Sequence, residues 1–414
     1  MLDADAIACR LARYAETEDA RALWPDVTPA AFRAAQEEVA RVAASVLGEA
    51  PGPVTLRIPP PADLRTLGIG AMTAGMGPLV GYWIETGRLA ADAAAATLFA
   101  LHLEHGRRRA ARLRCELERV VGACAERGVE PVVLKGAETA YRYFPDPGTR
   151  PIADLDLLVA PRDLLLAQDA LRSLGFTQDE VVVLQRGHWL PAERGRVRSL
   201  ELADAENPWH VDLHVSLDRW QAAGIVASLG AVDPYAAEPW AALPLPARVL
   251  PQPLHLAYLA LHASSYFFVL PMVRLVELVQ VARQDFRGRP ERWAALLDLL
   301  RDAGAGRFVY PALHLAEALA PGTVEPRLLE AVRAAAPRRL RRAVGALTPG
   351  SSQHIHPRPG SGRLIWAATP RQAVMVILGA IWPRSGAHLV PLRVLAGIYH
   401  HRMRRAVRAL AGGR

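Results

Sequence analysis

Residues 132–159 read VVLKGAETAYRYFPDPGTRPIADLDLLV, and the spacing of apolar residues within them decides the fold. The apolar run 132–134 and the run 152–159 have the length and the β-branched or leucine-rich composition of buried strands. Between them, residues 137–143 predict one or two helical turns, and PDPGTRP predicts a loop. The stretch therefore predicts strand, short helix, loop and strand.

Lys135 is the only lysine among the 49 lysine and arginine residues of the chain. Such a bias indicates a GC-rich coding sequence, in which a retained lysine marks a position that needs a compact ammonium rather than a planar guanidinium. Chance retention is the alternative. Lys135 and Gly136 also stand where the first strand meets a helix, so backbone N–H groups and the ammonium would together favour a phosphate there.

Asp154 and Asp156 are candidate metal ligands. On a strand they share one face, with Cα atoms about 6.5–7 Å apart, and their oxygen ligands suit Mg²⁺. A third acid on a neighbouring strand would complete the set, and Asp212 is the best candidate. Three carboxylates holding two Mg²⁺ ions, with Mn²⁺ as the alternative, can activate an attacking oxygen and stabilise a departing pyrophosphate. The alternative is that these acids are solvated and bind nothing.

The segment 210–217 predicts the strand that carries the third acid. His210, Asp212 and His214 alternate with apolar residues, so the three polar side chains share one face. His210 or Arg198 offers Asp212 an ordinary ion-pair partner instead of a metal. For His214 two roles remain open, a hydrogen-bonded structural histidine and a residue that orients a phosphate or aids proton transfer.

Length and composition set the class of protein. A chain of 414 residues, rich in alanine and leucine, predicts two to three mainly helical domains. Three cysteines without metal or disulfide spacing predict a reducing, cytoplasmic environment. The first thirty residues do not read as a signal peptide, and no apolar run reaches the roughly 18 residues of a transmembrane helix.

Changes in pattern along the chain predict four regions. A helical N-terminal region covers residues 1–127, and within it 87–127 predicts a pair of long helices. An α/β core covers 128–245, and a helical domain covers 246–350. A basic helical tail covers 351–414.

The net charge of +8 is unevenly distributed, because the chain from Ala331 onward has fifteen arginines and no acid. A basic tail of this kind is typical of contact with nucleic acid, an anionic membrane surface or an acidic partner. The alternatives are that the tail packs on its own body or is simply solvated.

The order of these motifs resembles a known group of enzymes. LKG at 134–136, an arginine-proline at 150–151, DLDLLV at 154–159 and DLH at 212–214 are similar to the nucleotidyltransferase superfamily of DNA polymerase β. The resemblance is closer to the large uncharacterised nucleotidyltransferase family of bacteria, and it spans about residues 86–285. Members of that family often accompany gene clusters for ribosomally made, modified peptides.

The resemblance implies an α+β fold, with a nucleotidyltransferase-type mixed β-sheet core flanked by mainly helical N- and C-terminal regions. It matches Asp154 and Asp156 to the paired metal-binding acids and Asp212 to the third acid. It also matches the turn at Lys135-Gly136 to the glycine motif that contacts nucleotide phosphate, and Arg150 to an arginine that precedes the paired acids.

The predicted function is a Mg²⁺-dependent nucleotidyltransferase. It would move a nucleoside monophosphate from a nucleoside triphosphate to a hydroxyl or phosphate of an acceptor. Asp154, Asp156 and Asp212 would hold the metal, while Lys135, Gly136, Arg150 and His214 would contact nucleotide phosphate. A peptide acceptor is implied by the resemblance alone.

The alternative is a non-catalytic binding or regulatory module that keeps the same fold. Ala137 stands where the superfamily usually has glycine or serine, and this altered turn favours the alternative. The basic tail would then hold an acidic partner.

Overall fold

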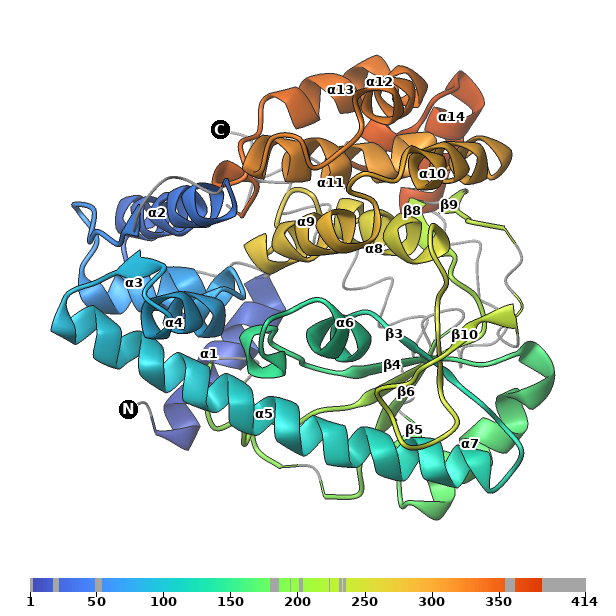
Figure 1. Cartoon of the computed structure of the whole chain (residues 1–414), viewed down its shortest axis with the longest axis horizontal. Helices are drawn as coiled ribbons and strands as arrows, with labels where there is room; N and C mark the ends of the chain where they lie inside the picture. Colours follow the sequence, from blue (N-terminus) through green and yellow to red (C-terminus); the bar gives the residue numbers. More distant parts are fainter. Residues whose placement is uncertain are drawn as a thin grey trace.

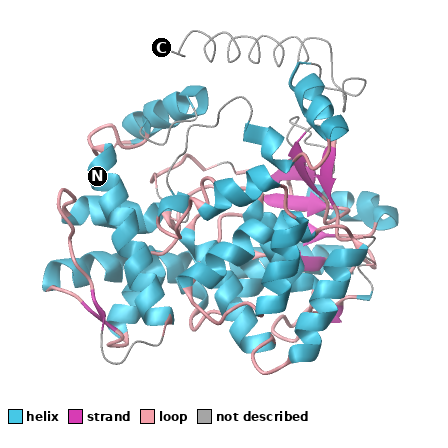
Figure 2. Cartoon of the chain, turned by 90° about the horizontal axis from the view of Figure 1, so that it is seen from above, coloured by secondary structure: helices cyan, strands magenta, loops and turns pink. Residues whose placement is uncertain are grey.

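The computed structural model describes residues 3–17, 22–48, 54–178, 186–193, 195–200, 204–222, 224–230, 233, 236–353 and 362–381. Helices predominate among them and surround a mixed β-sheet, so the predicted α+β class is confirmed. Figure 2 shows that most of the strands gather on one side of the molecule while helices make up the rest.

The main sheet has seven strands in the order β10-β11-β3-β4-β7-β6-β5. Its strands are β3 (Val132–Leu134), β4 (Leu155–Leu158), β5 (Thr177–Gln178), β6 (Arg186–Leu190), β7 (Val211–His214), β10 (Glu238–Pro239) and β11 (Arg248–Val249). β4 runs parallel to β7 and antiparallel to β3, while β6 runs antiparallel to β7. Two further pairs join β1 (Val54–Thr55) to β2 (Leu89–Ala90) and β8 (Arg219–Ala222) to β9 (Ile225–Ala227).

The helices before and within the sheet region are α1 (Ala4–Thr17), α2 (Pro29–Leu47), α3 (Leu64–Thr73), α4 (Gly77–Glu85), α5 (Ala93–Ala125), α6 (Gly136–Arg142) and α7 (Leu164–Ser173). Those after it are α8 (Leu254–Ser264), α9 (Met272–Asp285), α10 (Pro290–Asp302), α11 (Gly306–Leu319), α12 (Pro326–Ala335), α13 (Arg338–Gly345) and α14 (Pro370–Ile381). Short 3₁₀ turns among the described residues include η2 (Pro147–Thr149), η3 (Pro161–Asp163), η5 (Ser351–Gln353) and η6 (Gly362–Trp366).

Successive side chains along the central strands point to opposite sides, so the sheet has two different faces. Leu155 and Leu157 of β4 belong to a buried cluster with residues of α5 and α7. Leu158, on the other face of β4, belongs to a second cluster that contains much of α8 and α9. Figure 1 shows α5 on one side of β3 and β4, with α8 and α9 on the other. The polar residues of β4 and β7 therefore face α8 and α9.

The long segment before β3 forms one helix, so the predicted pair of helices was wrong. α5 runs unbroken from Ala93 to Ala125 through Gly106. A side chain at Gly106 would lie 2.2 Å from the carbonyl oxygen of Gly148, and one at Gly148 would lie 2.6 Å from the backbone of Arg107. The two glycines thus allow the loop before β4 to pack directly on α5, and the glycine in the helix serves this contact rather than a break.

The predicted strands around the site are confirmed, although two are shorter than predicted. β3 matches the prediction at both ends, β4 begins at Leu155 rather than at 152, and β7 ends at His214 rather than at 217. The division into four regions stays a prediction. Helices before β3 and helices after β11 contribute to one shared core, which includes Trp83 of α4 and Leu275 of α9.

Only part of the basic tail lies within the described residues. Trp366 of η6 is buried, with its ring 5.7 Å from both Phe267 and Phe308, so this portion packs on the body as one of the alternatives predicts. Residues 354–361 and 382–414 lie outside the described part. Within that part, no single helix has both the length and the apolar character to cross a membrane.

Candidate active site

Lys135 occupies a sharp turn between β3 and α6. Its φ of 52° and ψ of −128° make it the only non-glycine residue with positive φ among the described residues. Such a conformation costs a side-chain-bearing residue about 1–3 kcal/mol and is typical of functional positions, where the surrounding structure holds it in place. The turn directs the Lys135 ammonium toward Asp156, with which it forms an ion pair.

Asp156 lies at the centre of the polar face, and its side chain is only 4% exposed. Its carboxylate contacts the Lys135 ammonium and lies 2.9 Å from Nε2 of His214. Burial alone would raise the pKa of Asp156, but Lys135 and His214 lower it overall. Burial would likewise lower the pKa of Lys135, whereas Asp156 raises it overall. Both groups are therefore charged at neutral pH.

Asp212 lies directly opposite Asp156, because β4 and β7 pair in parallel with these two residues in register. On its other side Asp212 is in register with His188 of β6, whose Nδ1 is 3.0 Å from the Asp212 carboxylate. His210 Nε2 is 3.7 Å from the same carboxylate. The register of three strands thus brings an acid–acid–histidine row onto one face of the sheet.

Asp154 lies just before β4, at the open edge of this group. Its side chain is 37% exposed, and one carboxylate oxygen is 3.7 Å from His210 Nε2. Removal from water raises the pKa of Asp154, and the negative charge of Asp156 raises it further. Desolvation lowers the pKa of His210, and it also lowers that of His214 despite the hydrogen bond with Asp156. Both imidazoles are therefore neutral at physiological pH, which is the form that can bind a metal ion or accept a proton.

Among the residues that the structure describes, two groups of side chains are close enough to hold a metal ion. His188, His210 and Asp212 form one group, and Asp156, Asp212 and His214 form the other, with the ligand atoms of each group within 4.8 Å of one another. Asp212 belongs to both. Two of the three predicted acids, Asp156 and Asp212, thus come together with histidines, while Asp154 belongs to neither group.

Arg150 and Gly136 lie together at the edge of this region. Arg150 is buried, and its guanidinium donates to Glu277 of α9 at 3.0 Å, while Thr139 of α6 also hydrogen-bonds Glu277. A side chain at Gly136 would lie 3.4 Å from the Arg150 guanidinium, so glycine leaves that contact open. The charge of Arg150 is therefore already balanced by a buried acid, and the arginine ties the loop before β4 to the helices that cover the sheet.

Arg109 of α5 fixes the two acid-bearing strands relative to each other. Its side chain is buried, and it donates to carbonyl oxygens on both sides of the site: 3.0 Å to Ile152 and 2.9 Å to Ala153 before β4, and 2.6 Å to Asn207 and 3.2 Å to Pro208 before β7. Desolvation lowers the pKa of Arg109 to about 10. Sequence reasoning missed this residue, because nothing distinguishes it within the run Arg107–Arg109.

Two further arginines carry positive charge near the acids. Arg274 of α9 interacts electrostatically with Asp154 and Asp156, and desolvation lowers its pKa. Arg219 of β8 is near Lys135 and stacks on Tyr266 at 5.8 Å. Within the described residues neither guanidinium forms an ion pair with a carboxylate. In the sequence, Arg274 and Glu277 stand three residues apart among apolar residues of the same helix. This pattern indicates that their charges are buried.

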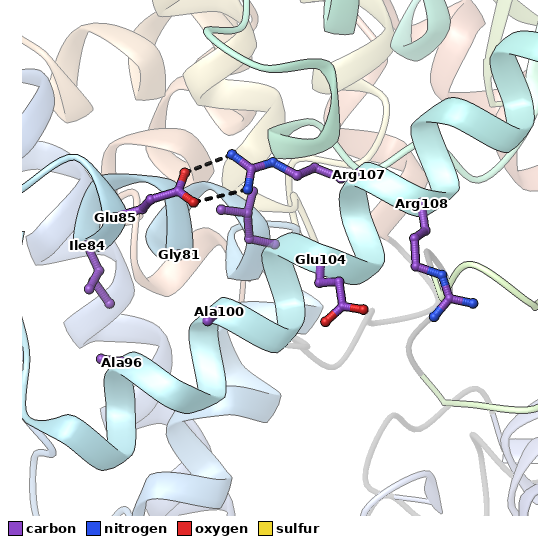
Figure 3. Close-up of a pocket in the computed structure, with 9 residues that line it drawn as sticks. Gly81, Ile84, Glu85, Ala96, Ala100, Glu104, Arg107 and Arg108 are labelled. Atoms are coloured by element: carbon purple, nitrogen blue, oxygen red, sulfur yellow. Dashed lines mark hydrogen bonds and ion pairs between the residues drawn. The ribbon is translucent and has the colours of Figure 1, made fainter.

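A separate open cavity of about 450 Å³ lies between α4 and α5. Figure 3 shows the ion pair between Glu85 and Arg107 at this cavity, which Arg108 also lines. Arg107 also bonds Asp146 at 2.7 Å, so its charge is balanced. None of the predicted site residues lines this cavity, and the acids and histidines of the sheet face remain the candidate site.

Comparison with known proteins is informative at the level of the family. A family model described as "Uncharacterised nucleotidyltransferase" matches residues 61–321, beyond both ends of the resemblance seen in the sequence. No curated protein and no solved structure matches the chain.

Proposed function

The chain belongs to the uncharacterised nucleotidyltransferase family, and from this premise we propose that it transfers a nucleoside monophosphate from a nucleoside triphosphate to an acceptor. The acceptor oxygen, from a hydroxyl or a phosphate, attacks the α-phosphorus. The bond from that phosphorus to the bridging oxygen breaks, and pyrophosphate leaves. The observation that carries the proposal is the register that sets Asp212 directly beside Asp156 on neighbouring parallel strands.

The donor set fits a divalent metal. Asp154, Asp156 and Asp212 supply carboxylate oxygens, which are the ligands that Mg²⁺ prefers, with Mn²⁺ as the alternative. When bound, two such ions would reduce the electrostatic repulsion between an attacking oxygen and the negatively charged triphosphate. In this proposal Asp212 accepts the proton of an acceptor hydroxyl, and the contact of its carboxylate with His188 at 3.0 Å supports this role.

Phosphate charge is met by the cations around the acids. Lys135 and Gly136 present an ammonium and a helix start, and the neutral His214 imidazole, which hydrogen-bonds Asp156, offers a phosphate a polar contact rather than charge. Arg150 contributes positive charge, although Glu277 already balances much of it. We add Arg274 and Arg219, because within the described residues neither forms an ion pair. These two arginines are the stronger candidates for the triphosphate.

The first experiment incubates the protein with each labelled nucleoside triphosphate, with and without Mg²⁺, and measures nucleotide binding and added mass on candidate acceptors. Asp154→Asn, Asp156→Asn and Asp212→Asn are each expected to lower turnover by at least about 100-fold, measured on the folded fraction because Asp156→Asn also removes the partner of Lys135. Asp169→Asn is the matched control, since Asp169 is an exposed acid paired with Arg127. Unchanged binding and turnover in the three site variants would exclude the proposal.

Arg274→Gln separates phosphate binding from metal binding. Loss of one charged hydrogen-bond donor is expected to weaken triphosphate binding by about 10-fold. Monophosphate binding changes less, because the β- and γ-phosphates are the groups that would lie near α9. Equal effects on both nucleotides would remove Arg274 from the phosphate site.

A peptide acceptor is the narrowest form of the proposal, and it rests on the family's association with modified-peptide gene clusters. Peptides encoded beside the gene are the acceptors to test, with a mass increase of one nucleotide as the expected product. We also propose the cytoplasm as the compartment, because Cys9, Cys115 and Cys124 are all free thiols.

A non-catalytic binding module is the second candidate. The ion pair between Lys135 and Asp156 favours it, since it already satisfies the central acid without any ion. The basic tail, most of it outside the described residues, would then hold an acidic partner or an anionic membrane. Capture of acidic peptides or vesicles that needs residues 382–414 and ignores the aspartate substitutions would support this second function over the first.

A further inference from the structure

Two histidines flank Asp212 on the same face of the sheet. His188 is in register with Asp212 across β6 and β7, and His210 precedes it by two residues on the chain. The imidazole rings of the two histidines lie 3.9 Å apart between centroids. Their side chains are 32% and 28% exposed, so the group is open to solvent on one side and closed by the sheet on the other.

The distances among these ligand atoms match those around a small transition-metal ion. His188 Nδ1 and His210 Nε2 lie 3.0 Å and 3.7 Å from Asp212 Oδ1. Zinc binds imidazole nitrogen at about 2.0–2.1 Å, which places neighbouring ligand atoms of a tetrahedral site about 3.3–3.4 Å apart. Asp154 lies next to this group, with one carboxylate oxygen 3.7 Å from His210 Nε2. The ligand atoms of His188, His210 and Asp212 all lie within 4.8 Å of one another, so these three side chains can surround one ion.

We propose that His188, His210 and Asp212 bind a divalent transition-metal ion of the zinc class, distinct from the Mg²⁺ that accompanies a nucleoside triphosphate. Imidazole nitrogen suits zinc and its neighbours in the first transition row, whereas Mg²⁺ prefers an all-oxygen set with several waters. The position of Lys135 also favours this assignment, because its ammonium occupies the Asp156 side of the carboxylate row. An added ion is therefore better accommodated on the histidine side.

A catalytic role of this ion rests on the proposed function, because Asp212 belongs both to the histidine site and to the proposed Mg²⁺ site. Ion binding itself does not depend on that function. The metal test therefore uses full-length protein freed of metal by a chelator, with Co²⁺ as the probe and no nucleotide present. Co²⁺ bound by imidazole and carboxylate gives visible absorption bands, and Zn²⁺ displaces it.

The expected result is one Co²⁺ per chain, displaced by Zn²⁺ and retained in millimolar Mg²⁺. His188→Gln and His210→Gln are each expected to weaken Co²⁺ binding by more than about 100-fold, since even changes behind the ligands cost about 10–100-fold. His105→Gln is the matched control, because His105 also pairs with an aspartate, Asp204, at 3.2 Å and is 35% exposed. The control should bind Co²⁺ as the wild type does.

Co²⁺ binding that survives both substitutions, or that millimolar Mg²⁺ abolishes, would overturn the inference. Thermal unfolding of the metal-free variants, matched to that of the wild type, shows that lost binding is not lost folding. The two proposals fail separately. Transfer of nucleotide with Mg²⁺ alone and no Co²⁺ binding removes the histidine site, whereas Co²⁺ binding without any nucleotide transfer removes the proposed reaction and leaves the histidine site in place.

Discussion

Lys135 and Asp156 form a buried ion pair in which each side chain is 4% exposed and the lysine backbone is held at a φ of 52°. Both features are unfavourable by themselves: a positive φ strains a residue with a side chain, and burial removes two charges from water. The pair is stable because each charge is the other's main partner. The strained turn is therefore what places the single lysine of the chain on the central acid.

Lys135→Met is expected to lower the free energy of unfolding by about 3–5 kcal/mol, because it leaves the buried Asp156 carboxylate with His214 as its one hydrogen-bond partner among the described residues. The double variant Lys135→Met, Asp156→Asn should recover part of this loss, since no unpaired charge then remains. Urea unfolding of the two single variants and the double variant measures the coupling. Strictly additive losses would show that the two residues do not act as a pair.

Arg109→Lys is expected to lower both stability and activity although it keeps the charge. A lysine ammonium cannot reach the carbonyl oxygens before β4 and before β7 at once, so the spacing of Asp154 and Asp212 would relax. We expect about 1–3 kcal/mol of lost stability and a fall in kcat larger than the change in KM. Arg108→Lys is the control, since Arg108 is 53% exposed and makes one surface ion pair. A normal kcat in a destabilised Arg109→Lys protein would limit Arg109 to a structural role.

Glu277→Gln is expected to destabilise the protein by about 3–5 kcal/mol, because the buried Arg150 guanidinium would lose its only acid among the described residues. The contact links α9 to the loop before β4, so unfolding of the covering helices should become easier. Urea denaturation, with the exposed Glu330→Gln as the reference, measures the effect. A loss below 1 kcal/mol, against the roughly 3–5 kcal/mol expected, would mean that water replaces the pair.

His102 of α5 is expected to make the protein less stable in acid. Its Nδ1 is buried without a hydrogen-bond partner among the described residues, and desolvation lowers the pKa of His102 from 6.5 to about 4. Because the unfolded state takes up the proton first, the stabilisation is complete above about pH 6.5 and is lost as pH falls from there toward 4. The loss from this group reaches at most about 3 kcal/mol.

The measurement is urea unfolding across that pH range, with His102→Gln compared with the wild type. The variant should show a shallower fall in stability with acid, since glutamine does not titrate. Other histidines with lowered pKa, such as His314, contribute equally to both proteins and cancel in the difference. Parallel pH profiles would contradict the assignment.

Local patterns were enough to predict the strands and acids of the site. The run before Lys135 is apolar and β-branched, and Asp154, Asp156 and Asp212 alternate with apolar residues, so each strand and its polar face could be recognised without neighbours. His188 could not be predicted, because its position depends on how β6 pairs with β7. The helix pair predicted for 87–127 was wrong for a related reason: the need for glycine at position 106 comes from the loop packed against it, which the sequence pattern does not show.

The sequence alone determined which residues are polar within apolar strands, where the strand-to-helix turn falls and which nucleotidyltransferase family the motifs resemble, because these are properties of neighbouring residues. The tertiary structure alone decided that Asp212 lies opposite Asp156, that Lys135 and Arg150 are paired with buried acids and that two histidines flank the row. These depend on strand register and on helices that arrive from more than a hundred residues away along the chain, as Glu277 does for Arg150. Register and burial are set by packing of the whole chain, and no local pattern encodes them.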